Sequence, residues 1–278
     1  MVRLLIIPIF SIIIYITMVF FEFGLIMLSL NKISNSSESQ LREIRKLRKN
    51  NVIAYPDVNS SLFLSGQLTK PIENYDEIIP LSGLKNSETV FCAESGKQVN
   101  YISDKFGFRN PSKIYDSDID IALLGDSFVH GHCVEDKMNI AGQLRLTFPK
   151  TLNLGLSGNG PLSILGSLIE FLPKIKPNYV FWFYFEGNDL INLKKEKKST
   201  LIKYLEPDFS QYLIDNLDKI DSEVKRIVDS QIEDNEINYF IESLKLKNIR
   251  NRLYIVRRLI TDGNKADSII NGKKYNYK

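Results

Sequence analysis

Three apolar segments, each followed by a polar loop, constrain the fold of this chain more than any other feature. The segments span 118–125, 151–156 and 178–187, and stretches with helical spacing at 136–148 and 161–172 separate them. A short apolar run bounded by turn residues is typical of a buried strand, and parallel strands need a crossover helix between them. The alternation predicts an α/β fold with a doubly wound parallel sheet.

The loop after each apolar segment carries residues that suit a reaction site. Gly-Asp-Ser occupies 125–127, "NLGLSGNGP" occupies 153–161, and "EGNDL" occupies 186–190. Loops beyond the carboxyl ends of parallel strands share one edge of the sheet, where ligands bind. A serine, a glycine N–H and an asparagine amide at one edge can form a nucleophile with an oxyanion hole. Each loop alone is equally typical of a helix cap or a turn, so the prediction depends on their order.

These loops resemble the sequence blocks of the SGNH (GDSL-type) hydrolase superfamily. Gly125–Ser127 matches the first block and Asn153–Gly158 the second, while Gly187–Asp189 matches the third only in part, because one inserted residue is absent. The lead-in "SDKFGFRNP" at 103–111 is similar to that of membrane-anchored bacterial members. The resemblance covers about 103–190 and implies a three-layer α/β/α, flavodoxin-like parallel sheet.

The resemblance also implies a reaction and assigns residues to it. Ser127 is the expected nucleophile, and its own N–H, the Gly158 N–H and the Asn188 side chain form the expected oxyanion hole. The implied reaction is ester hydrolysis or O-acyl transfer on an acyl or acetyl ester of a glycan or lipid, without cofactor or metal. Three further residues are expected to support this site: Asp126, Asp189 and His130.

The superfamily's general base has no counterpart in this sequence. That histidine belongs to a downstream Asp-x-x-His block, whereas the only two histidines here, His130 and His132, precede the second block. We expect both histidines to border the pocket mouth. The alternatives are that His130 acts as a substitute general base, or that the two histidines are metal ligands. A fourth strand is also missing. We therefore expect a C-terminally truncated domain with negligible esterase activity, an exposed sheet edge and poor solubility.

An apolar run over 4–30 with one charge, Glu22, exceeds the roughly 20 residues that span a bilayer. It predicts a single-pass anchor, with a cleaved signal peptide as the alternative. Six Lys or Arg residues follow the run over 32–49 and only Arg3 precedes it, which favours a cytoplasmic domain. Similar anchored proteins act outside the inner membrane, and long domains escape the charge rule, so we expect a periplasmic domain.

The remaining expectations concern partners and organisation. The chain has 36 Lys and Arg residues and 33 Asp and Glu residues, a net charge of +3, and the basic residues are dispersed along the sequence. This charge distribution argues against nucleic-acid binding. The expected partners are therefore an ester substrate and the membrane.

Cys92 and Cys133 form either a disulfide or two free thiols. Trp182 is expected in the core, and further helices are expected over 205–217 and 222–246. The expected parts are an anchor (1–31), a linker (32–53), an irregular lead-in with short strands (54–117) and the α/β domain (118–278).

Two functions outside catalysis also fit the sequence. The first is a membrane-tethered binding module that uses an SGNH-like pocket without turnover. The second is a structural membrane protein whose loops match the blocks by chance.

Overall fold

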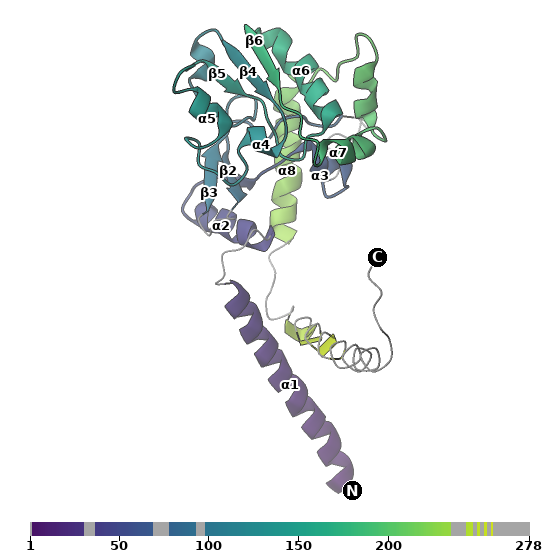
Figure 1. Cartoon of the computed structure of the whole chain (residues 1–278). Coiled ribbons are helices and arrows are strands. Elements are labelled where there is room, and N and C mark those ends of the chain that lie inside the picture. The colour runs from purple at the N-terminus through teal and green to yellow at the C-terminus, as the bar shows by residue number, and fades with distance from the viewer. Residues whose placement is uncertain are drawn as a thin grey trace, which may run out of the picture. The chain divides into compact units, whose positions relative to one another are not determined.

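The structure of the chain is a computed structural model (Figure 1). Two compact units make up the chain: Ile33–Glu233 is one, and Met1–Lys32 with Asp234–Lys278 is the other. The structure describes residues 2–30, 37–68, 78–92, 98–234, 243–246, 249–250, 253–254 and 257.

The smaller unit begins with helix α1, Val2–Leu30, which covers the predicted anchor segment. Glu22 of α1 is buried, and its carboxylate accepts a hydrogen bond from the Ile249 N–H at 2.9 Å. The Tyr15 hydroxyl donates to the Leu244 carbonyl at 3.0 Å. Across the part of the chain that the structure describes, no helix is long and apolar enough to cross a membrane. The anchor stays a prediction.

The larger unit contains a parallel sheet of three strands, as the alternating pattern predicted. β4 (Ile121–Leu124) lies in the centre, between β5 (Thr151–Asn153) and β6 (Tyr179–Trp182), and runs parallel to both. All four residues of β4 are buried, as expected for a central strand. The α/β class is therefore confirmed for this unit.

Helix α5 contacts β5, and helix α6 contacts the central strand of this sheet. Figure 1 shows α6 and α7 in this part of the molecule. α6 also contacts α7 and η2. α6 begins with Pro161, which suits the first helical position because a proline lacks the N–H that would remain unpaired there. The helical elements of the larger unit are α2 (Ser37–Lys49), α3 (Ser60–Leu64), η1 (Ile114–Asp116), α4 (Ser127–His130), α5 (Ile140–Leu144), α6 (Pro161–Ile175), α7 (Asp189–Glu196), η2 (Thr200–Leu205) and most of α8 (Leu217–Asp234).

The prediction of a helix over 205–217 is wrong. The helix predicted over 222–246 overlaps α8, and residues 235–242 of that prediction lie outside the described residues. A buried carboxylate explains the error. Glu170 of α6 accepts hydrogen bonds from the Gln211 N–H and, at 2.8 Å, from the Leu213 N–H. These amides are satisfied by a side chain, so the segment need not form helical bonds.

The predicted lead-in contains a second sheet of three short strands. β1 (Ala54–Pro56) pairs in parallel with β2 (Glu88–Cys92), which pairs antiparallel with β3 (Val99–Ile102). These strands confirm the short strands expected in the lead-in. Within the turn segment 103–111 that follows, the Asp104 carboxylate accepts hydrogen bonds from the Phe106 and Phe108 N–H groups at 2.8 and 2.9 Å. The Ser103 N–H ties the start of this segment to the Ser87 carbonyl at 3.0 Å.

The outer strand β6 is exposed rather than buried. Tyr179, Val180, Phe181 and Trp182 are 66, 41, 49 and 42 % exposed. The expectation that Trp182 lies in the core is therefore wrong, while the expected exposed edge of the sheet is confirmed. The apolar run was a correct signal for a strand, but the sequence alone did not show that nothing among the described residues covers it.

Candidate functional site

The loops that follow the three parallel strands start side by side at one edge of the sheet. The strands are in register, with Ile121 paired to both Thr151 and Tyr179. The pairing continues past the end of the central strand, where the Leu156 N–H donates to the Gly125 carbonyl at 3.2 Å. This geometry agrees with the expectation that the three loops share one edge.

Ser127 is the first residue of the four-residue helix α4, directly beyond the central strand. Asp126 is the N-cap, and its Oδ1 accepts a hydrogen bond from the Phe128 N–H at 3.0 Å. Ser127 is partly exposed, and its hydroxyl has no hydrogen-bond partner within the described residues. A hydroxyl of this kind can meet a substrate, but it needs a base to become a good nucleophile.

Asn153 ties the second loop to the helix that carries Ser127. Its Nδ2 donates to the Val129 carbonyl at 2.8 Å, and its Oδ1 accepts from the Gly155 N–H at 2.8 Å. Gly155 lies so close to α4 that a Cβ there would come within 2.6 Å of the Val129 side chain. The backbone of the second loop therefore approaches α4 at a position that requires glycine.

Gly158, the expected oxyanion-hole residue, has a left-handed backbone conformation with φ +78°. It lies against the α3 region, where a Cβ would meet the Ser61 Oγ at 2.6 Å and the Asn59 Oδ1 at 3.4 Å. Its N–H donates to no other group in the described part of the chain. Gly158 thus offers a free amide donor, in a conformation that favours glycine.

The third loop meets the first through aromatic and acidic residues. The Phe185 and Phe128 rings lie 4.6 Å apart, and the Phe185 N–H donates to the Asp189 Oδ2 at 2.8 Å. Burial, with Asp126 and Glu196 nearby, raises the pKa of Asp189. Three buried acceptors lack a partner in the described structure: Asp126 Oδ2, Asn188 Oδ1 and Asp189 Oδ1.

These contacts join the first loop to both others. They do not join Ser127, Gly158 and Asn188 directly, since no described hydrogen bond links any two of them. The convergence of the three groups on one oxyanion therefore stays a prediction.

His130 lies in a buried network, not at a pocket mouth as expected. Its Nε2 lies 3.0 Å from the Tyr101 hydroxyl, and its Nδ1 lies 3.0 Å from the Ser157 Oγ. Because the Ser157 N–H also donates to Nδ1, at 3.1 Å, this nitrogen is the unprotonated one, and Nε2–H donates to Tyr101. The Tyr101 hydroxyl in turn donates to the Asp57 Oδ1 at 3.5 Å. Both ring nitrogens are thus occupied away from Ser127.

Burial sets the charge states of this network. It lowers the pKa of His130 well below 6.5, with further lowering from Arg109 and His132. It raises the pKa of Asp57 to about 6 and raises that of Tyr101. Sequence reasoning missed Ser157 and Tyr101 as partners of His130, and Asp57 as the partner of Tyr101, because they come from three segments far apart in the chain.

Replacing His130 with glutamine is expected to change how stability depends on pH. The unfolded chain takes up a proton on His130 below pH about 6.5, whereas the native chain does so only at a much lower pH. Between pH about 6.5 and the lowered native pKa, His130 costs the wild type about 1.4 kcal/mol more of unfolding free energy for each unit that the pH falls, and nothing above pH about 6.5. The raised pKa of Asp57 has the opposite effect on the pH dependence of stability, but Asp57 is present in both the wild type and the variant, so its effect cancels in the comparison. Urea titrations at several pH values should show that the unfolding free energy of the variant, relative to that of the wild type, increases as the pH falls. A difference that does not change with pH contradicts a neutral buried His130.

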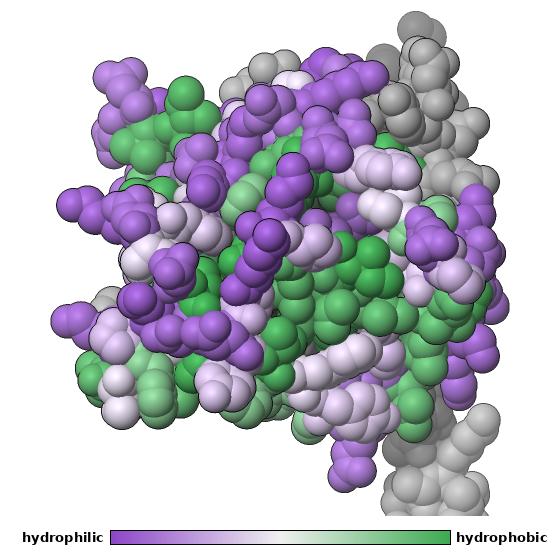
Figure 2. All heavy atoms as spheres, turned by 90° about the horizontal axis from the view of Figure 1, so that it is seen from above, coloured by the Kyte–Doolittle hydropathy of each residue, from purple (hydrophilic) through white to green (hydrophobic). Residues whose placement is uncertain are grey.

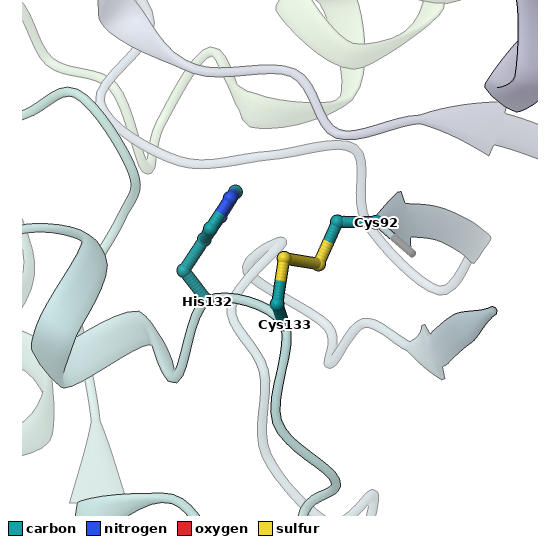
Figure 3. Close-up of side chains that lie close together, drawn as sticks. All are labelled: Cys92, His132 and Cys133. Carbon is teal, nitrogen blue, oxygen red and sulfur yellow. A yellow bond between two sulfur atoms is a disulfide. The ribbon is translucent and has the colours of Figure 1, made fainter. Parts of the chain in front are cut away.

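The two cysteines form a disulfide, which decides between the alternatives that the sequence left open. Cys92 and Cys133 have Cα atoms 5.4 Å apart, and His132 lies beside them (Figure 3). The ligand atoms of these three residues lie within 4.8 Å of one another. With its sulfurs bonded to each other the cluster offers no thiolate, so it could hold a metal only after reduction.

Arg109 fixes the loop that carries Cys133. Arg109 is buried, with 3 % of its surface exposed. Its guanidinium donates to the Gly131 and Val134 carbonyls, both at 2.8 Å, and to the Asp136 Oδ1 at 2.6 Å. Arg109 therefore holds both ends of the turn after α4.

A cavity of about 380 Å³ lies near this arginine and apart from the predicted site. Its two arginines already donate to carbonyls and side chains of the chain, Arg109 as above and Arg145 to the Thr151 carbonyl at 2.9 Å. None of the six predicted site residues lines it. The lining residues are Ile102, Ser103, Arg109, Asn110, Pro111, Ser112, Asp136 and Arg145.

Comparisons of this chain with protein families, with characterised proteins and with solved structures found no match.

Proposed function

We propose that this chain carries an SGNH-type ester hydrolase or O-acyltransferase site with Ser127 as its nucleophile. The observation that carries the proposal is the strand order β5-β4-β6, because it brings the three block-like loops to one edge with Ser127 beyond the central strand. The proposed substrate class is an acyl or acetyl ester of a glycan or lipid. The finer fold, a three-layer flavodoxin-like sheet, belongs to the same proposal.

The proposed chemistry follows from the groups at this edge. The Ser127 Oγ attacks the ester carbonyl carbon, and its proton passes to a base. The Ser127 N–H, the Gly158 N–H and the Asn188 side chain stabilise the oxyanion; the alcohol then leaves, and water or an acceptor hydroxyl takes the acyl group. Within the described residues neither histidine is placed on the Ser127 hydroxyl, since His130 is occupied and the His132 Nδ1 lies 3.4 Å from the Ser157 Oγ.

Covalent labelling with a fluorophosphonate probe tests this proposal. The Ser127 Oγ forms the bond to phosphorus and fluoride leaves; because no described base takes the proton, we expect slow labelling that added imidazole accelerates. The Ser127→Ala variant is expected to lose the label with or without imidazole. Mass spectrometry of the labelled peptide identifies the serine.

Ser157→Ala is the matched control, because Ser157 has the histidine contact that Ser127 lacks. It is expected to keep the label. Labelling that persists in Ser127→Ala and disappears in Ser157→Ala overturns the assignment of the nucleophile.

A non-catalytic binding module is the second candidate, and the occupied nitrogens of His130 favour it. The same experiment separates the two functions. A site that only binds esters gives no covalent adduct at Ser127, even with imidazole present.

We also propose a membrane anchor over the N-terminal helix and a periplasmic location for the larger unit. The apolar sequence of α1 supports the anchor. The Cys92–Cys133 disulfide supports an oxidising compartment.

A further inference from the structure

The open edge of the parallel sheet is the largest apolar feature that the proposed function does not use. Seven consecutive residues from Tyr179 to Phe185 are Tyr, Val, Phe or Trp, and each is between 38 and 66 % exposed. Figure 2, which views the molecule from above, shows a broad hydrophobic area among hydrophilic side chains. An exposed apolar edge strand is a ready template for pairing with another strand.

Two backbone hydrogen bonds show which groups of this strand remain unpaired. The Tyr179 N–H donates to the Asp120 carbonyl and the Phe183 N–H to the Leu124 carbonyl, both at 2.8 Å. The odd-numbered residues therefore direct their backbone groups toward β4. Since these directions alternate along a strand, Val180, Trp182 and Tyr184 direct theirs toward the open edge.

The two ends of this strand carry opposite charges. Lys176 precedes it and Glu186 follows it; both are exposed, and neither has an ion-pair partner among the described residues. They lie five residues before and five residues after Phe181. Lys176 is the left-handed C-cap of α6 and Glu186 lies in a turn, so neither belongs to the strand itself. An antiparallel two-fold arrangement about Phe181 would still bring the lysine end of each strand near the glutamate end of a second copy.

We propose that β6 pairs with β6 of a second copy of this chain, antiparallel, about a two-fold axis at Phe181. The pairing joins two three-stranded sheets into one of six strands. The edge-facing backbone groups of Val180 bond those of Trp182 in the partner copy, and Phe181 faces itself in a non-hydrogen-bonded pair. Two Lys176–Glu186 pairs close the ends of the interface.

Self-pairing accounts for the strand better than a foreign strand does. A two-fold interface requires a self-complementary surface, and an apolar strand with a lysine at one end and a glutamate at the other meets that requirement. The same arrangement opposes parallel pairing in register with an identical copy, because that would place like charges together at both ends.

Cysteine cross-linking tests the register. In a non-hydrogen-bonded antiparallel pair the Cα atoms lie about 4.5 Å apart, so Phe181→Cys in the detergent-solubilised full chain is expected to form a covalent dimer under mild oxidation. Tyr184→Cys is the matched control: in this register it faces Asn178 and is expected to stay monomeric on a non-reducing gel. Equal cross-linking of both variants, or none in Phe181→Cys, overturns the register.

Charge exchange tests the interface without changing its apolar core. Light scattering on the full chain should show a mass of two polypeptides. Lys176→Glu or Glu186→Lys alone is expected to raise the dimer dissociation constant about tenfold, and the double exchange to restore it. Lys137→Glu, an exposed change away from β6, should leave it unaltered. A monomer at every concentration, or single exchanges without effect, overturns the proposal.

Discussion

Replacing Glu196 with alanine is expected to lower the free energy of unfolding by about 3–5 kcal/mol. The Glu196 carboxylate is fully buried and accepts hydrogen bonds from the Gly160, Leu162 and Ser163 N–H groups at 2.8, 2.9 and 3.2 Å. The Ser163 hydroxyl donates to it as well, at 2.5 Å. Alanine leaves these buried donors unpaired and removes a negative charge from the N-terminus of α6. Urea titration followed by circular dichroism measures the loss.

Two variants define what the Glu196 result means. Glu196→Gln keeps one carbonyl acceptor and should lose less than alanine does. Glu206→Ala removes an exposed glutamate and should change stability by about 0.5 kcal/mol or less. If Glu196→Ala behaves like Glu206→Ala, the carboxylate does not stabilise the start of α6.

Glu196 also connects the second and third loops of the candidate site. It lies at the end of α7, whose first turn contains Asp189, and it accepts hydrogen bonds from the N–H of Gly160 in the second loop and of Leu162 directly after that loop. A loss of stability in Glu196→Ala should therefore be accompanied by weaker fluorophosphonate labelling of Ser127, because both loops lose a shared support.

The parts of the fold that local patterns specify could be predicted from the sequence. Apolar runs bounded by turn residues located the three parallel strands, and the glycines at 155 and 158 occupy positions where a side chain would collide or strain the backbone. These signals are contained within a few neighbouring residues, so one sequence suffices to interpret them.

Contacts between distant segments could not be predicted in the same way. His130 had no partner within its own segment, yet Tyr101 and Ser157, 29 and 27 residues away, occupy its ring nitrogens. The helix expected over 205–217 failed for a similar reason, since Glu170, 41 residues from Gln211, binds the amides there. Such a partner reverses a local preference, and periodicity carries no information about it.

Burial was the least predictable property, as β6 demonstrates. Its sequence has the composition of a buried parallel strand, and β4 with a similar composition is fully buried. Edge position alone does not explain the difference, because β5 also has a single strand neighbour and all three of its residues are buried. Helix α5 contacts β5, whereas nothing among the described residues covers β6. Hydrophobic sequence therefore predicted the strand and not its surroundings.

Replacing Gly107 with alanine is expected to destabilise the larger unit by more than about 4 kcal/mol. Gly107 has φ +94°, and a Cβ there would overlap the carbonyl of Gly83, whose N–H donates to the Gly107 carbonyl at 3.2 Å. Neither backbone can retreat without breaking this bond and moving Phe108, which is fully buried. Urea titration of the full chain measures the change.

Gly66→Ala separates the two causes of that loss. Gly66 has a similar left-handed conformation, φ +72°, but a Cβ there would meet nothing within 4 Å. Its variant should lose only the conformational cost of a non-glycine residue, about 1–2 kcal/mol. The excess loss in Gly107→Ala then measures the collision with Gly83. Equal losses at the two positions would show that the segments carrying Gly83 and Gly107 are not in close contact.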